Sequence, residues 1–389
     1  MDNRIKLADR LNALPPYLFA EIDRKKKALM DKGVDIISLG VGDPDMPTPE
    51  NIIKAGQKAL ENPAYHQYPF GRGLTEFRGT VAAWYRDRFG VTLNPEGEVH
   101  ALIGSKEGIG HLPLALVNPG DTVLVPDPGY PVYRSSTIFA GGEPYTMPLL
   151  EENGFLPDLK SIPGDVLKRA RLMFINYPNN PTAATADKGF FSEVVSFAEK
   201  NNIVVAHDAA YTELYFGQPP DSFLAAAGAK DVGVEFHSLS KTYNMTGWRI
   251  AWICGNAEVI RGIAKVKDNY DSGAFSAVQS AGIEALTGPQ DAVLDIRRTY
   301  LERRDVLING LKEAGWKLNN PGATFYVWAN CPEGYSSTGC SGKLLNEAAV
   351  VATPGVGLGK HGEGYVRFAL TVDRKRMKEA VERIKKVKW

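Results

Sequence analysis

Short apolar runs alternate with amphipathic stretches between about residues 47 and 286. The apolar runs are nearly continuous, without a polar residue at every second position, which is typical of strands that are covered on both faces. They predict strands at residues 99–103, 122–125, 172–175, 203–207, 232–237 and 249–254. Strands separated by helices in this way predict an α/β fold with a mainly parallel sheet flanked by helices.

The pattern differs on both sides of this region. After Asp291 the sequence predicts a long charged helix, short strands near 324–328 and 365–370, and a basic terminal helix. Apolar residues keep roughly helical spacing at 17–32. Because 389 residues exceed one ordinary core, we expect more than one domain. The predicted parts are an arm with part of a small domain at 1–46, a large domain at 47–286, and a small α+β domain at 287–389.

Composition excludes several classes of protein. Lysine plus arginine and aspartate plus glutamate number 45 each, so no net charge attracts nucleic acid or a membrane surface. Cys254, Cys331 and Cys340 form no CxxC pair, and the six histidines show no metal-binding spacing. No run is apolar enough to span a bilayer or to serve as a signal peptide. We expect a cytoplasmic protein without a metal, a nucleic-acid partner or a membrane.

Polar residues follow several of the predicted strands. They are Ser105, Lys106, Asn180, Asp208 and the segment 238–241. In a parallel sheet, ligands bind in the crevice beyond the carboxyl ends of the strands. The convergence of these residues at one edge predicts a binding site there.

Asp208 ends an apolar run, so its carboxylate is expected to be partly desolvated and to need a cationic or hydrogen-bonding partner. The simpler alternative is a helix N-cap. A protonated pyridine nitrogen would be a more specific partner, because the ring could then accept electrons. Tyr211, three residues later, could reach the same ring, although a single tyrosine at such a position is more often a packed aromatic residue than a ligand.

Lys241 follows Ser238 and Ser240 and precedes Arg249 by eight residues. A lysine after a strand is most often a solvated loop residue. Hydroxyl groups and a guanidinium at a strand end, however, suit a phosphate group. Ser105 and Lys106, at the start of a predicted helix, add backbone N–H donors and a favourable dipole. An amine beside an anchored phosphate and an acid for the ring nitrogen is typical of a pyridoxal phosphate site.

Further motifs follow in order along the chain. They are Gly42-Asp43-Pro44-Asp45, Tyr68 with Gly73, Pro128-Gly129-Tyr130, Asn179-Asn180-Pro181-Thr182, Asp208-Ala209-Ala210-Tyr211, Ser238-Leu239-Ser240-Lys241 with Arg249, and Tyr365-Val366-Arg367. In this order they resemble the class I/II, fold-type I pyridoxal-phosphate-dependent aminotransferases over almost the whole chain. Ala183 departs from the glycine that this family usually has after Asn-Pro-Thr, which puts the local turn in doubt.

The resemblance implies a seven-stranded sheet and a homodimer with shared active sites. It implies that Lys241 holds the cofactor as a Schiff base and carries the transferred proton, that Asp208 pairs with the ring nitrogen, and that Tyr211 contacts the ring oxygen. The further cofactor contacts that it implies are Asn180 and Tyr130 at the ring, Ser105, Lys106, Ser238, Ser240 and Arg249 at the phosphate, and Tyr68 from the neighbouring subunit. The substrate contacts that it implies are Arg367 with the α-carboxylate, and Gly42, Tyr130 and Asn180.

Segments outside this common core are similar to LL-diaminopimelate aminotransferases. They are residues 14–22, 102–108, 127–133 and 176–181. This resemblance implies amino exchange between LL-diaminopimelate, or tetrahydrodipicolinate, and 2-oxoglutarate or glutamate in lysine biosynthesis. It adds Tyr17, Lys106 and, from the partner subunit, Ser272 as substrate contacts, although Tyr17 could instead be an arm residue that packs on the core. Gly71 stands where some members carry an acid, so recognition of the distal ammonium is unexplained.

Other functions were weighed against this one. The sequence at 357–362 matches GxGxxG, but it precedes a predicted strand and leaves too few residues for a nicotinamide-binding βαβ unit. A regulatory sensor with this fold would carry a DNA-binding domain ahead of it. Aminotransferases for aspartate, alanine or aromatic amino acids, and a β-lyase that cleaves C–S bonds, share the cofactor residues and stay open as alternatives.

Overall fold

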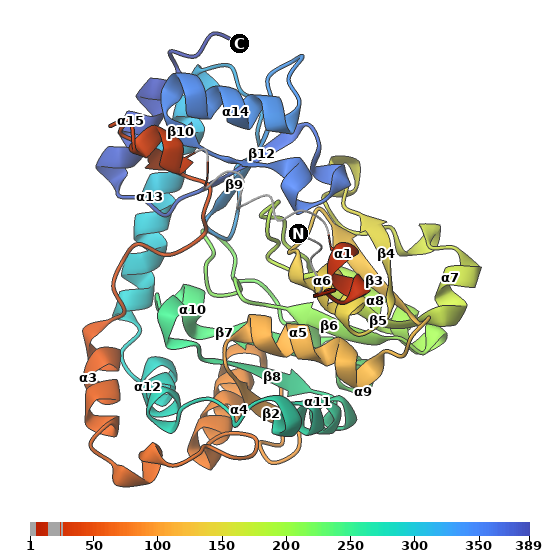
Figure 1. The fold of residues 1–389 in the computed structure, drawn as a ribbon. Helices are drawn as coiled ribbons and strands as arrows, with labels where there is room; N and C mark the ends of the chain where they lie inside the picture. Colours follow the sequence, from red (N-terminus) through yellow and green to blue (C-terminus); the bar gives the residue numbers. More distant parts are fainter. Residues whose placement is uncertain (1–4, 15–23, 25) are drawn as a thin grey trace.

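The computed structural model describes residues 5–14, 24 and 26–389. A seven-stranded sheet forms the centre of the larger part, in the order β2-β8-β7-β6-β5-β3-β4 (Figure 1). Only β8 runs against the other strands, since its pairings with β2 and β7 are antiparallel and the remaining pairings are parallel. The predicted α/β fold with a mainly parallel, seven-stranded sheet is confirmed.

The strands of this sheet are β2 (Val99–Leu102), β3 (Thr122–Asp127), β4 (Glu143–Pro148), β5 (Ala170–Asn176), β6 (Val204–Asp208), β7 (Gly233–Ser238) and β8 (Ala251–Gly255). The sequence did not predict β4, which lies at the edge of the sheet, is mostly not buried and contains two prolines. An edge strand tolerates proline because one side of it needs no ladder hydrogen bonds. The strand predicted at 249–254 begins two residues later, because Arg249 has a left-handed backbone with φ 56°.

Helices cover both faces of the sheet. Apolar residues of α5 (Ser105–Leu116), α6 (Val132–Phe139) and α11 (Ala257–Tyr270) share one buried cluster with one face. Those of α4 (Thr75–Phe89), α8 (Lys188–Asn201) and α12 (Ser276–Thr287) share a second cluster with the other. The other α-helices among the described residues of this part are α3 (Glu50–Ala59), α7 (Gly164–Arg169), α9 (Ala229–Val232) and α10 (Leu239–Thr242).

A third buried cluster belongs to the smaller part of the chain. There β11 (Thr353–Pro354), β12 (Tyr365–Ala369) and β9 (Tyr326–Asn330) form an antiparallel sheet, and β1 (Ile37–Ser38) pairs with β10 (Val350–Val351). The helices are α13 (Asp291–Glu313), α14 (Ser337–Ala348) and α15 (Arg374–Ile384). The pairing of β1 shows how an N-terminal segment joins the C-terminal part. The boundaries at 46/47 and 286/287 stay predictions.

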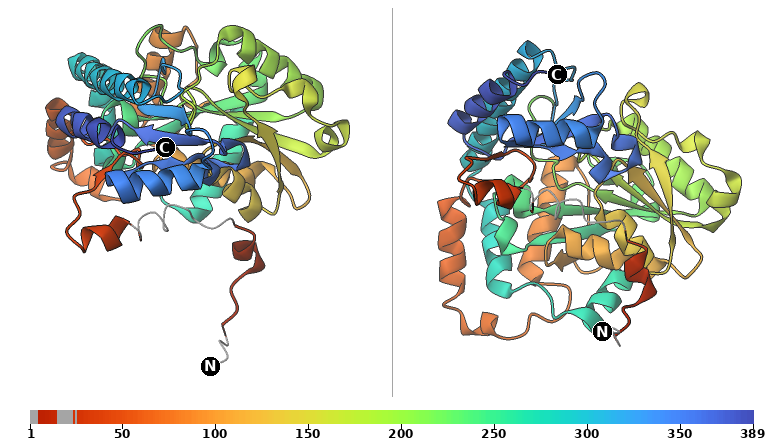
Figure 2. Two further views of the ribbon diagram at one scale, coloured as in Figure 1. Left: turned by 90° about the horizontal axis from the view of Figure 1, so that it is seen from above. Right: turned by 45° about the horizontal axis from the view of Figure 1, so that its top comes forward.

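Residues 5–13 lie apart from these cores. Figure 2 shows α1 (Asp9–Asn12) outside the body of the molecule, and the side chains of residues 5–13 are exposed. Most of the helix predicted at 17–32 falls outside the described residues, and residues 26–30 are helical. No helix in the described part of the chain has the length and apolar character needed to cross a membrane.

Candidate active site

Lys241 lies where three parts of the chain meet. Strand β7 ends at Ser238, whose Oγ accepts a 3.1 Å hydrogen bond from the N–H of Ser240 and caps α10, the short helix that carries Lys241. Nζ of Lys241 donates a 3.0 Å hydrogen bond to the carbonyl oxygen of Gly42 and lies 5.6 Å from the centre of the Phe325 ring. The predicted site therefore receives residues from the segment before α3 and from the smaller part of the chain.

The surroundings of Lys241 make its amine a nucleophile. Burial lowers the pKa of Lys241 to about 8, and the positive charges of Arg249 and Arg367 act in the same direction against the opposing carboxylate of Asp43. The uncharged fraction of the amine near neutral pH is therefore larger than for an ordinary lysine, and only the uncharged amine can attack a carbonyl carbon.

Asp208, at the end of β6, is a buried acid held by hydrogen bonds. It is 5% exposed, and its carboxylate accepts hydrogen bonds from the Tyr133 hydroxyl at 2.7 Å and from the N–H of Ala210 at 3.3 Å. Burial raises the pKa of Asp208, while the Tyr133 hydrogen bond and the charge of His207 oppose this shift. A buried carboxylate in this setting favours a cationic partner.

Two tyrosines that the sequence analysis missed complete this region. Tyr133 lies one helical turn after Tyr130 in the chain, and the two rings meet edge to face at 5.8 Å. The hydroxyl of Tyr326 lies 3.2 Å from that of Tyr211, and burial raises the pKa of Tyr211 well above its usual range. Tyr211 therefore keeps its proton and can donate it in a hydrogen bond. Two sequence signals could have found these tyrosines. Tyr133 comes three residues after Tyr130, and Tyr326 stands two residues before Trp328, so that both lie on one face of the predicted strand.

Arg367 is oriented by partners from distant segments. Its Nη1 donates to Oδ1 of Asn180 at 2.7 Å and its Nη2 to the carbonyl oxygen of Gly40 at 2.9 Å. The guanidinium lies 4.3 Å from the centre of the Tyr326 ring, and Arg367 is 3% exposed. Its buried Nε has no hydrogen-bond partner among the described residues. Such a fixed, incompletely paired guanidinium suits a carboxylate ligand.

The approach of the backbone to Tyr326 explains Gly42. A Cβ atom at this position would overlap the hydroxyl of Tyr326. Glycine is therefore required by the contact itself, since the Gly42 carbonyl must also stay within reach of Lys241.

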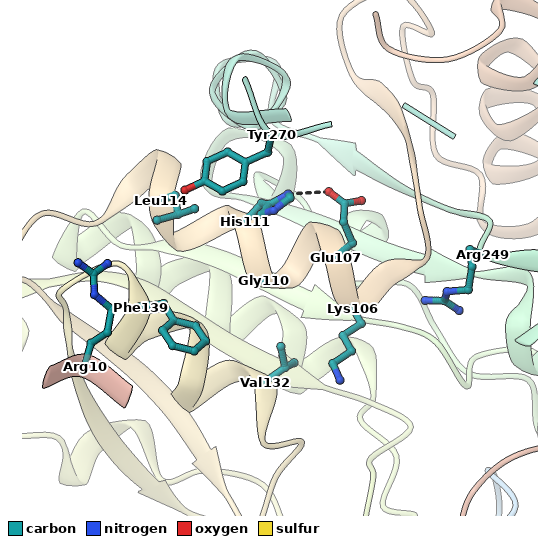
Figure 3. A pocket seen from close by; sticks show the side chains of 10 residues that line it. All are labelled: Arg10, Lys106, Glu107, Gly110, His111, Leu114, Val132, Phe139, Arg249 and Tyr270. Atoms are coloured by element: carbon teal, nitrogen blue, oxygen red, sulfur yellow. Dashed lines mark hydrogen bonds and ion pairs between the residues drawn. The ribbon is translucent and has the colours of Figure 1, made fainter. Parts of the chain in front are cut away.

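The start of α5 and Arg249 form an anion-binding corner. Gly104, with φ 79°, directly precedes α5, and a Cβ there would overlap the guanidinium of Arg249. Ser105 and Lys106 are the first residues of α5, where free backbone N–H groups and the helix dipole favour an anion. Figure 3 shows the side chain of Arg249 directed toward this first turn, from which Lys106 extends. The arrangement could hold a phosphate group.

A pocket of about 590 Å³ adjoins this corner. Its lining includes Lys106 and Arg249 at one end and Arg10 of α1 at the other, with Tyr270 and His111 on α11 and α5 (Figure 3). Three cationic side chains therefore border it. Such a pocket is suited to acidic groups.

One group of described side chains in this neighbourhood has the spacing of metal ligands: Glu107, His111 and Asp271. The ammonium of Lys267 lies 2.9 Å from Glu107 and 3.0 Å from Asp271. Since this buried lysine already compensates the two carboxylates, the group is better described as an ion-pair network that ties α11 to α5.

The structure places the other predicted residues at the edges of the site or away from it. Ser238 and Ser240 flank Lys241, and Tyr130 follows β3. Tyr68 is 74% exposed and stacks on Phe70, while Ser272 lines a small cavity with Phe70 and Gly71. Neither residue is brought to Lys241 by this chain. Tyr17 lies outside the described residues.

Comparison with known proteins decides the family. The family described as Aminotransferase class I and II matches residues 34–384. The chain belongs to this family. Members of this family are pyridoxal-phosphate enzymes, and the chain is accordingly an aminotransferase.

Relatives cover nearly the whole chain. The aminotransferase is 60% identical over 383 residues to the LL-diaminopimelate aminotransferase of Syntrophobacter fumaroxidans, covering 98% of this chain and 99% of that protein. It is 56% identical over 384 residues to the LL-diaminopimelate aminotransferase of Aquifex aeolicus, with 98% and 99% covered.

Solved structures share the fold. Substrate-bound BacF of Bacillus subtilis is 42% identical with a TM-score of 0.94, and 98% of both chains is covered. A single mutant of the Thermus thermophilus aspartate aminotransferase is 30% identical with a TM-score of 0.92, covering 99% of this chain and 100% of that one.

The described residues fit pyridoxal phosphate. The buried Asp208 suits the ring nitrogen, and the amine of Lys241 suits the carbonyl carbon. The guanidinium of Arg249 lies against Gly104 at the first turn of α5, where a cation and backbone N–H groups suit a phosphate. These residues match a group that has a nitrogen able to pair with a carboxylate at one end and an anion at the other.

Proposed function

We propose that this chain is an LL-diaminopimelate aminotransferase, which exchanges an amino group between LL-2,6-diaminopimelate, or tetrahydrodipicolinate, and 2-oxoglutarate or glutamate in lysine biosynthesis. The near-complete coverage by relatives of that name supports the substrate. The observation that carries the chemistry is the buried Lys241 amine, whose pKa burial lowers to about 8, in a site that Arg367 and Asp208 also border.

Pyridoxal phosphate, when bound, would supply a carbonyl carbon that condenses with amines and a ring that accepts electrons. Asp208 would hold the proton of the ring nitrogen, and Tyr211 would donate to the ring oxygen with its hydroxyl. The residues that would hold the remaining parts are Asn180 and Tyr130 at the ring and Ser105, Lys106, Ser238, Ser240 and Arg249 at the phosphate.

Lys241 would act first as nucleophile and then as base. Its amine is uncharged above about pH 8 and can therefore take the proton from the substrate α-carbon. Its short helix is capped by Ser238, which fixes the backbone from which the amine extends.

Arg367 would bind the α-carboxylate. Asn180 and Gly40 hold its guanidinium in one orientation before substrate arrives, so little side-chain entropy is lost on binding. Gly42 would let the backbone come close to this carboxylate, because a residue with a side chain would overlap Tyr326.

The distal end of the substrate would face the pocket bordered by Lys106 and Arg249. LL-diaminopimelate carries a second carboxylate, which needs a cation in a partly enclosed site. Lys106 is exposed and extends into this pocket in Figure 3. Tyr17 and the partner's Ser272 would add polar contacts.

A homodimer would complete the site. Large aromatic side chains are exposed on the loop at 68–70 and at the end of α11, where Phe70 and Tyr270 are 76% and 67% exposed. Apolar side chains of this size at a surface mark an interface. Pairing there would bring Tyr68 of one subunit to the phosphate of the other, and the exposed α1 segment could then pack on the partner.

Single-turnover spectroscopy of the purified protein tests the proposal. Glutamate and LL-diaminopimelate are each expected to convert the absorbance of the lysine-bound cofactor to that of its aminated form, and 2-oxoglutarate to restore it. Lys241→Ala should abolish both changes, whereas Lys188→Ala, at an exposed position, should leave them intact. Conversion by aspartate, alanine or an aromatic amino acid but not by LL-diaminopimelate would contradict the substrate. Pyruvate and ammonia formed from a sulfur amino acid, without conversion, would indicate the β-lyase.

A further inference from the structure

His207 lies directly before Asp208 on β6, and its side chain is on the opposite face of the sheet. The ring is fully buried and packs against Phe191 and Phe223, with ring centres 5.1 and 6.3 Å away. Its Nδ1 lies 2.8 Å from Oε2 of Glu235, on β7, and its Nε2 lies 2.9 Å from the carbonyl oxygen of Tyr177. Both ring nitrogens therefore make hydrogen bonds.

Both partners of His207 are acceptors. A peptide carbonyl such as that of Tyr177 can only accept. Glu235 already accepts from the Tyr85 hydroxyl at 2.7 Å, from Ser222 Oγ at 3.0 Å and from the N–H of Phe223 at 3.0 Å. Burial by itself raises the pKa of Glu235, but the hydrogen bonds from His207 and Tyr85 more than offset this effect and hold the pKa below its usual value. Glu235 is therefore a carboxylate.

A neutral imidazole cannot satisfy this arrangement. It carries one N–H and one lone pair, so one of its nitrogens would face an oxygen lone pair inside the core. The imidazolium has two N–H donors and fits both acceptors, and a buried positive charge next to a carboxylate is compensated.

We propose that His207 is held as an imidazolium by Glu235 and acts as a positioning residue that keeps Asp208 ionised for the cofactor. The charge of His207 opposes the effect of burial on the pKa of Asp208. The inference rests on the proposed function for the identity of the Asp208 partner. It extends that function by adding the ion pair of His207 and Glu235, on the face of the sheet opposite to Asp208.

The same ring also fixes the loop that carries Asn180. Its Nε2–H donates to the carbonyl of Tyr177, three residues before Asn180. Asn180 in turn accepts from Arg367. His207 thus contacts the backbone that leads to the substrate-carboxylate site while its charge acts on the ring-nitrogen site.

The other ionisable groups around the pair do not supply an alternative charge. Burial lowers the pKa of His237, on β7, to about 4, and burial raises the pKa values of Tyr85 on α4 and Cys254 on β8 well above their usual ranges. All three are neutral near pH 7. Two cations act on these groups, Arg88 on His237 and Lys230 on Cys254, and they are already paired with Glu213 and Glu98.

Nuclear magnetic resonance of the full chain labelled with ¹⁵N at histidine tests the charge directly. His207, identified by contacts of its ring protons with Phe191 and Phe223, is expected to carry a proton on both ring nitrogens at pH 7. The measurement is made with and without cofactor, so it stands apart from any test of transamination. A single protonated nitrogen at pH 7 would overturn the proposal.

Glu235→Gln tests the effect on Asp208. Without the carboxylate, His207 is expected to become neutral and the affinity for pyridoxal phosphate to fall about tenfold near pH 7. This deficit should shrink as pH rises, because Asp208 ionises again at higher pH. Tyr85→Phe is the matched control, since it removes a buried hydrogen bond to the same carboxylate but leaves the His207 contact. Equal, pH-independent losses in both variants would show a merely structural role and sink the idea, and if Glu235→Gln does not fold, the resonance measurement on the unaltered chain decides.

Discussion

Arg367 Nη1 and Asn180 Oδ1 form a 2.7 Å hydrogen bond across 187 residues of chain. This bond joins β12 of the smaller part to the loop after β5 of the large sheet. The guanidinium is thereby held in place by groups that are not themselves charged, so its charge stays available for a ligand. An arginine whose charge is left uncompensated in a buried place is an expected feature of a carboxylate-binding site.

Arg367→Lys should therefore raise the KM values for amino acid and oxo acid by about 100-fold, equivalent to about 3 kcal/mol, because lysine cannot form the bidentate contact. Steady-state kinetics with glutamate and 2-oxoglutarate measure the effect. Arg374→Lys, at an exposed position beside Glu302, is the control and should leave both constants unchanged. Unchanged KM values in Arg367→Lys would show that the carboxylate binds elsewhere.

The pKa of Lys241 sets the pH dependence of cofactor attachment. Because burial depresses this pKa to about 8 from 10.5, the fraction of uncharged amine, and with it the rate of attachment to cofactor-free protein, should rise about tenfold per pH unit below pH 8 and then level off. Stopped-flow absorbance gives the profile. Asp43→Asn removes the charge that raises this pKa and should move the midpoint to lower pH. A rate that still climbs above pH 9 would show that the amine is not desolvated.

Gly42→Ala should damage the site through Tyr326. The new methyl group would overlap the Tyr326 hydroxyl and displace it from Tyr211, at a cost of about 1–3 kcal/mol in the free energy of unfolding. We expect a loss of activity with it. Gly79→Ala on α4, where a methyl group meets open space, should be neutral or slightly stabilising. Chemical denaturation and turnover of both variants are compared, and wild-type behaviour of Gly42→Ala would mean that this contact is dispensable.

Ala183 occupies a backbone conformation that favours glycine. Its φ is 60°, and its N–H donates to the carbonyl oxygen of Asn179 at 2.9 Å, so the tight turn is formed despite the methyl group. Ala183→Gly should raise the free energy of unfolding by up to about 1 kcal/mol, since relief of left-handed strain exceeds the added entropy of the unfolded chain. Ala186→Gly, which lacks a positive φ, should lower it by a similar amount. Destabilisation of both variants to the same extent would remove the argument for strain.

The sequence was most informative where apolar runs are continuous. Strands such as β5 and β6 are buried along almost their whole length, so their continuous apolar runs indicated them. Strand β4 was not predicted because its residues are partly exposed and its two prolines suggest a loop. The reversed direction of β8 could not be predicted either, since apolar content does not encode strand orientation.

Residues of the site were predictable from the sequence when they belong to a motif that follows a strand. They were not predictable when only the pairing of strands brings them together. Lys241 and Asp208 follow strands directly, and strand ends in a parallel sheet share one edge. His207 meets Glu235 because β6 and β7 pair with these two residues in register. That register depends on strand order, which the sequence of either strand does not contain. Tyr326 likewise reaches Tyr211 only through packing of the two parts of the chain.

The reversal of β8 has a mechanical consequence. Since β8 returns beside β7, the hairpin between them contains both Lys241 and Arg249, within about ten residues. The amine of Lys241 and the guanidinium of Arg249 are thus both carried by the short connection between β7 and β8 of the large sheet. Any displacement of β9 and β12 relative to the large sheet would therefore move Arg367 without changing the spacing of Lys241 and Arg249.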